Sequence, residues 1–212
     1  MTLALLVVML LVAAAVLFST SSAHHTQAAA STAARAPGTA ARTPSATVQA
    51  LRAPSFATAY EPGWTLTSKV GPDGATRHQL SSTGAPIDGL GLPPSGAVGI
   101  TIDEGPLSGV LDRRFLSLAD KSVLALLRLT VGTPRGAREV TLAGAPRATT
   151  LGGVQAAEEA YTYFYEGRQN TQVDVLSKRD GHSVLIELDA EPALSRQSKA
   201  ALELLVTDWR WS

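Results

Sequence analysis

Three consecutive stretches decide the fold of this chain: EEAYTYFYE (Glu158–Glu166), TQVDVLSK (Thr171–Lys178) and HSVLIELD (His182–Asp189). In the last two, apolar and polar side chains alternate, which is the pattern of a β-strand with one buried face. Short polar segments join the three stretches, and the second segment contains Asp180-Gly181, a strong signal for a tight hairpin turn. The sequence therefore predicts an antiparallel meander of three strands.

Two amphipathic helices are expected on either side of this meander in the sequence. One spans Asp112–Thr130, and the other opens at Glu191-Pro192 and runs to Val206, with proline at its first helical position. Shorter extended runs predict further strands at residues 56–60, 64–70, 75–82, 97–103, 139–142 and 208–211. Helices segregated from an antiparallel sheet form an α+β fold. We therefore expect residues 56–212 to form an α/β/α sandwich, in which helices flank an antiparallel β-sheet.

The N-terminus is apolar and uncharged. Leu3–Phe18 (LALLVVMLLVAAAVLF) contains no polar side chain, and as a helix it would be about 24 Å long. The uncharged run continues beyond Ala23, so residues 1–23 are long enough for a transmembrane anchor, and small residues near Ala23 also allow a cleaved signal peptide. Both alternatives place the rest of the chain outside the cytoplasm, and the length favours a single-pass anchor. The chain has no cysteine, which excludes an acylated lipoprotein anchor and disulfides.

Residues 24–55 have the composition of a disordered linker. They are rich in Ala, Ser, Thr and Pro and carry no acidic residue, because the first acidic residue of the chain is Glu61. Such a tract buries too little apolar surface to offset the entropy of ordering. His24 and His25 are the only residues of this tract that commonly bind metals. Two adjacent histidines in a disordered tract are a weak indication of a metal site. We expect this segment to be a spacer.

Several local patterns in residues 56–212 resemble the PsbP-like fold family of small extracytoplasmic bacterial proteins. They are Gly63-Trp64 at an early strand, the turn at residues 142–148, the aromatic strand at 161–165, the Asp180-Gly181 hairpin, and a last helix leading into Trp209–Trp211. The resemblance implies an α+β sandwich with a binding or assembly role, and it brings no catalytic residues. The Gly- and Pro-rich stretch at residues 84–96 departs from this pattern.

No catalytic motif is present. The chain lacks cysteine, and it contains neither the Gly-x-Ser-x-Gly pattern nor Ser-x-x-Lys. Only His78 and His182 fall within the folded region, so a histidine base would be one of them. His182 follows a hairpin turn, where a structural role is expected. We therefore expect no enzyme and no cofactor.

Asp174, Glu187 and Asp189 form the best candidate metal site. Each alternates with apolar residues of its strand, so all three should lie on one face of two adjacent strands. Clustered carboxylates suit calcium or magnesium. The alternative is a solvated sheet face balanced by Lys178 and Arg168.

Tyr161, Tyr163 and Tyr165 occupy alternate positions and must share one face of their strand. Tyrosine combines a large apolar body with a polar tip, which suits a binding surface. The alternative is that a helix covers these side chains. No Lys/Arg cluster accompanies them, so nucleic acid is not an expected partner.

Together these features predict a membrane-tethered or secreted extracytoplasmic binding or assembly module with a protein partner in the cell envelope. Its N-terminal segment would contact the membrane. A metal-dependent hydrolase and a carrier of small ligands are the alternatives.

Overall fold

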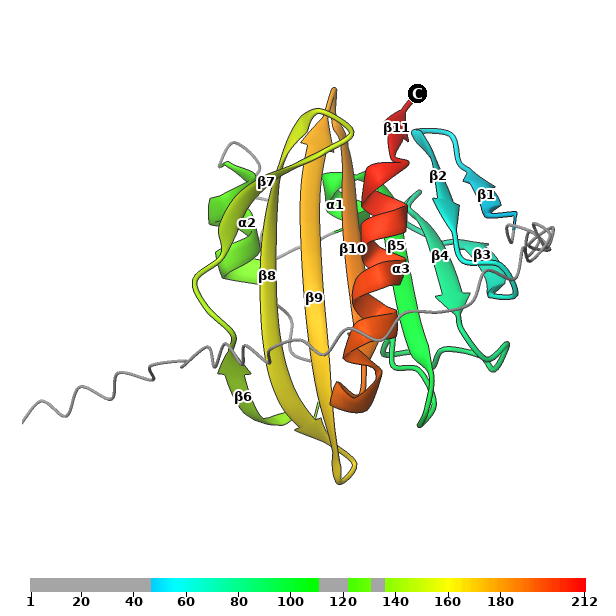
Figure 1. Ribbon diagram of the computed structural model, residues 1–212. Coiled ribbons are helices and arrows are strands. Elements are labelled where there is room, and N and C mark those ends of the chain that lie inside the picture. The colour runs from blue at the N-terminus through cyan, green and yellow to red at the C-terminus, as the bar shows by residue number, and fades with distance from the viewer. Residues whose placement is uncertain (1–46, 111–121, 131–135) are drawn as a thin grey trace, which may run out of the picture. The chain divides into compact units, whose positions relative to one another are not determined.

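The computed structural model describes residues 47–110, 122–130 and 136–212 (Figure 1). The candidate anchor at residues 1–23, the pair His24-His25 and the first part of the predicted helix at 112–130 lie outside these residues. Among the described residues, no helix is both long and apolar enough to cross a membrane.

The fold is built on an antiparallel sheet, as the sequence predicted, and this sheet has eight strands. Seven strands follow one another in the spatial order β3-β4-β5-β10-β9-β8-β6, and β7 also pairs with β8. Their bounds are β3 (Thr65–Val70), β4 (Thr76–Ser81), β5 (Val98–Pro106), β6 (Arg138–Leu142), β7 (Arg147–Leu151), β8 (Val154–Tyr165), β9 (Arg168–Arg179) and β10 (His182–Ala190).

Two tight turns set the register of the β8–β9–β10 meander. His182 pairs with Arg179, so Asp180 and Gly181 form a two-residue turn, and both have positive φ angles of 50° and 82°. Two consecutive positive φ angles are what a type I′ hairpin turn requires. The turn between β8 and β9 is equally short, because Tyr165 pairs directly with Arg168. The predicted hairpin is confirmed, and the first turn is tighter than the sequence suggested.

A second, three-stranded sheet has the order β1-β2-β11, with β1 (Gln49–Arg52), β2 (Phe56–Tyr60) and β11 (Arg210–Trp211). Strand β1 lies inside the range 24–55 that was expected to be a disordered linker. Leu51 is 3% exposed and belongs to the main hydrophobic core. The expected linker boundary at residue 55 is therefore wrong, because pairing with β2 and burial of Leu51 order the four residues of β1.

Helix α3 (Ser195–Thr207) follows a short 3-10 turn, η2 (Pro192–Leu194), and packs on β2 and β10. Its buried residues Ala201 and Leu205 join the core between the two sheets. In the same core the ring of Phe56 stacks on Trp209, with centroids 4.0 Å apart and planes 12° from parallel. This contact joins the small sheet to the segment that follows α3.

The opposite face of the main sheet carries α1 (Leu107–Val110) and α2 (Val123–Thr130). The neighbouring residues Ala156 and Ala157 of β8 show the two faces: Ala156 lies in the core with α3, and Ala157 lies in the core with Leu126 and Leu127 of α2. Consecutive strand residues point to opposite faces. Helices thus lie on both faces of a large antiparallel sheet, which confirms the α+β class (Figure 1).

The turn between β7 and β8 consists of Gly152 and Gly153, with φ angles of 55° and 81°. The two glycines differ in the space around them. A Cβ added to Gly152 would lie 2.8 Å from Cδ1 of Trp209, whereas a Cβ on Gly153 would meet nothing within 4 Å.

We predict that Gly152→Ala lowers the free energy of unfolding more than Gly153→Ala does. Both substitutions incur the left-handed backbone penalty of about 1–2 kcal/mol. Only Gly152→Ala also forces Trp209 to move, and this overpacking lowers the free energy of unfolding by a further amount of about 1–3 kcal/mol. Urea unfolding of the two variants measures the difference. Equal losses would show that Trp209 does not pack against this turn.

Candidate functional site

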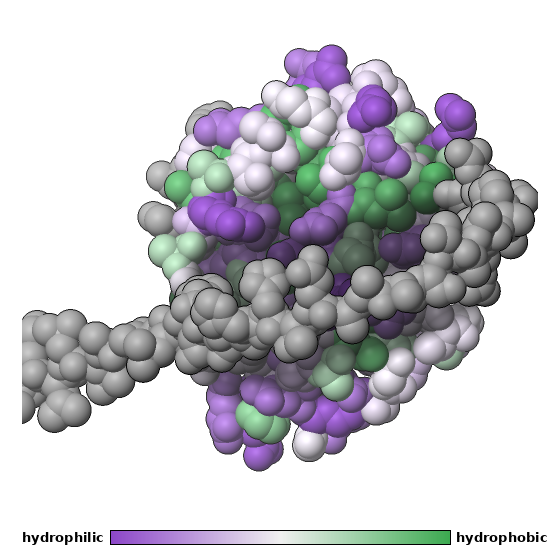
Figure 2. Space-filling model, viewed as in Figure 1, coloured by the Kyte–Doolittle hydropathy of each residue, from purple (hydrophilic) through white to green (hydrophobic). Residues whose placement is uncertain are grey.

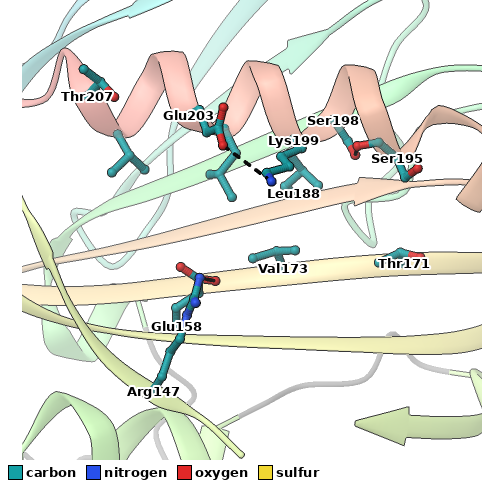
Figure 3. Close-up of a pocket in the computed structure, with 12 residues that line it drawn as sticks. Arg147, Glu158, Thr171, Val173, Leu188, Ser195, Ser198, Lys199, Glu203 and Thr207 are labelled. Atoms are coloured by element: carbon teal, nitrogen blue, oxygen red, sulfur yellow. Dashed lines mark hydrogen bonds and ion pairs between the residues drawn. The ribbon is translucent and has the colours of Figure 1, made fainter. Parts of the chain in front are cut away.

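A groove of about 400 Å³ lies between helix α3 and strands β9 and β10 (Figure 3). We call it the α3 groove. Its floor is formed by four apolar side chains: Val173, Leu188, Leu202 and Val206. Leu202 and Val206 are one helical turn apart and therefore share a face of α3. Figure 2, drawn in the view of Figure 1, shows apolar side chains gathered among polar ones on the face that carries α3.

Small polar residues on α3 help to keep this groove open. Ser198 is 7% exposed, and its hydroxyl donates a hydrogen bond to the carbonyl oxygen of Ser195 at 3.0 Å. The bond satisfies the buried hydroxyl within the helix. A larger apolar residue at position 198 would fill the space that the groove occupies. The presence of Ser198 in an otherwise apolar stripe of the predicted helix is the one signal of the groove in the sequence.

The rim of the α3 groove is charged and balanced. Arg147 pairs with Glu158 at 2.6 Å, and Lys199 pairs with Glu203 at 3.8 Å across one turn of α3. Figure 3 shows these pairs on opposite sides of the apolar floor. The groove therefore combines an apolar floor with a polar rim that carries no net charge.

The predicted carboxylate group lies on the other face of the sheet. Asp174 pairs with Glu187 across β9 and β10, and Asp189 pairs with Gln172, so Asp174, Glu187 and Asp189 share one face as predicted. The face is not solvated, because Asp174 is 2% and Asp189 is 3% exposed. Arg168, expected to balance these carboxylates, pairs with Glu191 at 3.5 Å.

The structure does not support a metal site among these carboxylates. Within the described residues, no group of three or more His, Asp or Glu side chains is arranged to hold a metal ion. Neighbouring side chains instead donate hydrogen bonds to some of the carboxylate oxygens. Gln172 donates to Asp174 Oδ1 at 2.8 Å, and the Tyr163 hydroxyl donates to Asp189 Oδ2.

Tyr161 and Tyr163 are fully buried, and Tyr165 is partly buried. The expected exposed tyrosine surface is therefore wrong for Tyr161 and Tyr163. They pack with Leu92, which belongs to the Gly- and Pro-rich loop at residues 84–96. Asp88 holds this loop in shape by accepting hydrogen bonds from the backbone of Leu90 and Leu92, each at 2.8 Å. The loop thus provides the cover that the sequence alternative had assigned to a helix.

Burial determines the ionisation of this acidic face. It raises the pKa of Asp189 to about 7, and the hydrogen bond from Tyr163 only partly opposes the shift. Burial and the neighbouring Asp103 raise the pKa of Glu187 to about 7. Burial, followed by the charge of Glu187, also raises the pKa of Asp174 well above its usual value. These carboxyl groups therefore keep their protons to higher pH than exposed carboxyl groups do.

No protein-family model and no curated protein sequence matches this chain. Solved structures do match. The cyanobacterial PsbP protein (CyanoP) of Synechocystis aligns over 83% of this chain and 99% of its own, with a TM-score of 0.50 and 10% identity. The described domain has a PsbP-like α+β fold.

Two further solved structures resemble this chain with TM-scores below 0.5. LpqN of Mycobacterium tuberculosis, a protein involved in cell envelope biogenesis, covers 78% of this chain and 91% of its own, with a TM-score of 0.48 and 15% identity. The Ran-binding protein Mog1p of Saccharomyces cerevisiae covers 78% and 96%, with a TM-score of 0.45 and 11% identity. At 10% identity the CyanoP comparison establishes the fold alone, and function must be argued from the site.

We predict that the domain is more stable at pH 5 than at pH 8. Asp189 has a pKa of about 7 in the folded chain and an ordinary value of 3.8. Its stabilising contribution is complete below pH 3.8 and is lost as the pH rises through about 7. For this one group the loss between pH 5 and pH 8 is about 2–3 kcal/mol.

Urea unfolding at several pH values tests this dependence. Asp189→Asn should flatten the pH profile and make the variant more stable than the parent at pH 8, because the amide keeps an acceptor for Tyr163 and cannot ionise. Asp180→Asn is the control, since Asp180 lies in an exposed hairpin with a side chain that is 84% accessible. A profile that is unchanged in Asp189→Asn would contradict the assignment.

Proposed function

We propose that this domain is an extracytoplasmic binding module that recognises apolar side chains of a protein partner in the α3 groove. The observation that carries the proposal is the apolar floor of the groove, formed by Val173, Leu188, Leu202 and Val206. Water in contact with these side chains is released when a partner covers them, and this release favours binding.

The composition of the groove rim favours a protein as the partner. Protein interfaces combine an apolar centre with a polar margin that excludes water from it. The pairs Arg147–Glu158 and Lys199–Glu203 provide such a margin with no excess of either sign. A phosphate backbone would require a surplus of cations, which this rim lacks.

The proposed location rests on the N-terminal sequence. Leu3–Phe18 has the composition of a membrane-inserted or signal segment, and the tract that follows it has the composition of a spacer. We propose that the segment holds the domain at the outer face of the membrane, or is removed during secretion. Sequencing the N-terminus of the mature protein distinguishes retention from cleavage.

A carrier of small apolar ligands is the second candidate, because a groove of about 400 Å³ falls within the size range of ligand sites. The third function considered from the sequence, a metal-dependent hydrolase, is not proposed. Two of its candidate carboxylates, Asp174 and Asp189, are buried, and no group of three metal-binding side chains is found among the described residues.

We predict that Leu202→Gln weakens partner binding about 10-fold or more, because it places an amide on the floor of the groove. Leu204→Gln is the matched control: it changes the same residue type on the same helix, at a position that does not line the groove. Both leucines are partly exposed, so each substitution should cost only about 1 kcal/mol of stability.

Crosslinking in intact cells measures this binding. A photoreactive residue at Ser195, on the groove, should yield a discrete crosslinked protein, and one at Gln197, which is exposed on the same helix but off the groove, should not. Leu202→Gln should remove the product, and Leu204→Gln should retain it. The same product from both positions would contradict the groove as the binding site. For the second candidate, mass spectrometry of an organic extract of the purified protein should reveal a ligand that Leu202→Gln loses.

A further inference from the structure

A chain of polar side chains crosses the edge of the main sheet, away from the α3 groove. The hydroxyl oxygen of Ser68 on β3 lies 2.8 Å from Nδ1 of His78 on β4. Nε2 of His78 lies 3.1 Å from Oε1 of Glu104 on β5. Three neighbouring strands thus bring a serine, a histidine and a carboxylate into one connected series.

Two further contacts hold this series in place. Ser55, in the turn between β1 and β2, donates its hydroxyl to Glu104 Oε2 and its backbone N–H to the same oxygen at 3.3 Å. The ring of Phe56 meets the imidazole of His78 edge to face, with centroids 5.8 Å apart and an angle of 88°. The carboxylate and the imidazole ring are therefore both fixed in orientation.

The charge of Glu104 determines the direction of the hydrogen bonds. Burial would raise the pKa of Glu104, but the hydrogen bonds from His78 and Ser55 outweigh it, so the pKa lies below its usual value and the carboxyl is ionised at neutral pH. An ionised carboxylate only accepts hydrogen bonds. Nε2 of His78 must then carry the proton that it donates to Glu104. In the neutral ring this leaves Nδ1 as an acceptor, and Ser68 donates its hydroxyl proton to it.

The solvent exposure of the three side chains suits nucleophilic chemistry, which requires an accessible nucleophile and a shielded base. His78 is 4% and Glu104 is 3% exposed, whereas Ser68 is exposed to solvent on β3, the outermost strand of the sheet. Val70, which shares the face of β3 with Ser68, is 71% exposed. A reactant can reach the serine from solvent, while water has little access to the base and its carboxylate.

We propose that Ser68 is a nucleophile that accepts an acyl group from an activated ester or thioester, with His78 as general base and Glu104 as the residue that positions it. The hydroxyl oxygen of Ser68 attacks the acyl carbon, and its proton passes to Nδ1 of His78. The bond from the acyl carbon to the leaving oxygen or sulfur then breaks. The leaving group keeps the electron pair and takes the proton from His78.

The proposed acylation is separate from partner binding in the α3 groove, because none of its residues lines that groove. The exposed Val70 beside Ser68 favours an apolar acyl group. Thr67, the residue before Ser68, provides a comparison on the same strand. It is also exposed, but it points to the opposite face and pairs with Gln79, so it has no imidazole to take its proton.

Incubation of the full domain with p-nitrophenyl butyrate tests the proposal. We expect a burst of p-nitrophenolate and a gain of one butyryl group per chain by intact-mass measurement, located at Ser68 by peptide mapping. Ser68→Ala should abolish both signals. Thr67→Ala should leave both unchanged. No burst with the parent protein, or equal acylation in Ser68→Ala, would overturn the proposal.

His78→Gln should slow acylation about 100-fold or more, as expected for loss of a general base. Because His78 is buried, a thermal melt must first show that this variant is folded; if it is not, Ser68→Ala decides the matter alone. For Glu104, the readout is the low-field proton resonance of His78 Nε2–H. Glu104→Gln should move it upfield and slow acylation together, and acylation at the parent rate in Glu104→Gln would refute the positioning role.

Discussion

Side chains of β8, β9 and β10 alternate between two faces of the main sheet, and both faces are covered. On one face Val175, Ile186 and Leu188 meet α3 and the small sheet in the main hydrophobic core. On the other face, the same alternation places Asp174 and Asp189, which are buried, and Glu187, which is half-buried. An antiparallel sheet can leave one face in water, but here helices α1 and α2 and the loop at residues 84–96 cover the second face of the main sheet as well. The acidic residues are therefore enclosed as a consequence of the architecture.

Enclosure determines the chemistry of the acidic face. An ionised carboxylate without a counter-ion is costly to bury, so these groups keep their protons at higher pH and accept hydrogen bonds from tyrosine and glutamine. One oxygen of Asp189 is buried without a hydrogen-bond partner in the described part of the chain. The apolar face offsets this cost. Its stacked Phe56 and Trp209 and the aliphatic side chains of β5 and β10 belong to the main hydrophobic core.

The sequence predicted the structural features that depend on residues close together in the chain. The meander, the Asp180-Gly181 turn and the last helix follow from alternation, turn chemistry and a well-placed proline. Properties that depend on distant segments could not be read in this way. Tyr161 and Tyr163 are buried because Leu92, about 70 residues away along the chain, folds over them. Strand β1 has the composition of the linker and is ordered only because it pairs with β2.

The candidate sites also differ in how far they depend on segments that are distant in the sequence. The shared face of Asp174, Glu187 and Asp189 was predictable from strand period, whereas its burial was not. The α3 groove depends on the gap between a helix and a sheet, and Ser198 is its one local sign. The Ser68–His78–Glu104 series required the register of three strands, in which His78 stands opposite Ser68 and Glu104 lies two residues beyond the partner of His78. No spacing within one segment encodes that arrangement.

Both proposed sites depend on the core around α3, at different parts of the sheet. The α3 groove lies over β9 and β10, and the Ser68 series lies over β3, β4 and β5. Phe56 links them, because its ring touches His78 on one side and stacks on Trp209 on the other. A substitution at Phe56 or Trp209 would disturb both sites through stability and could not separate them. Leu202 and Ser68 are each accessible from outside the core, so changes at these positions separate partner binding from acylation.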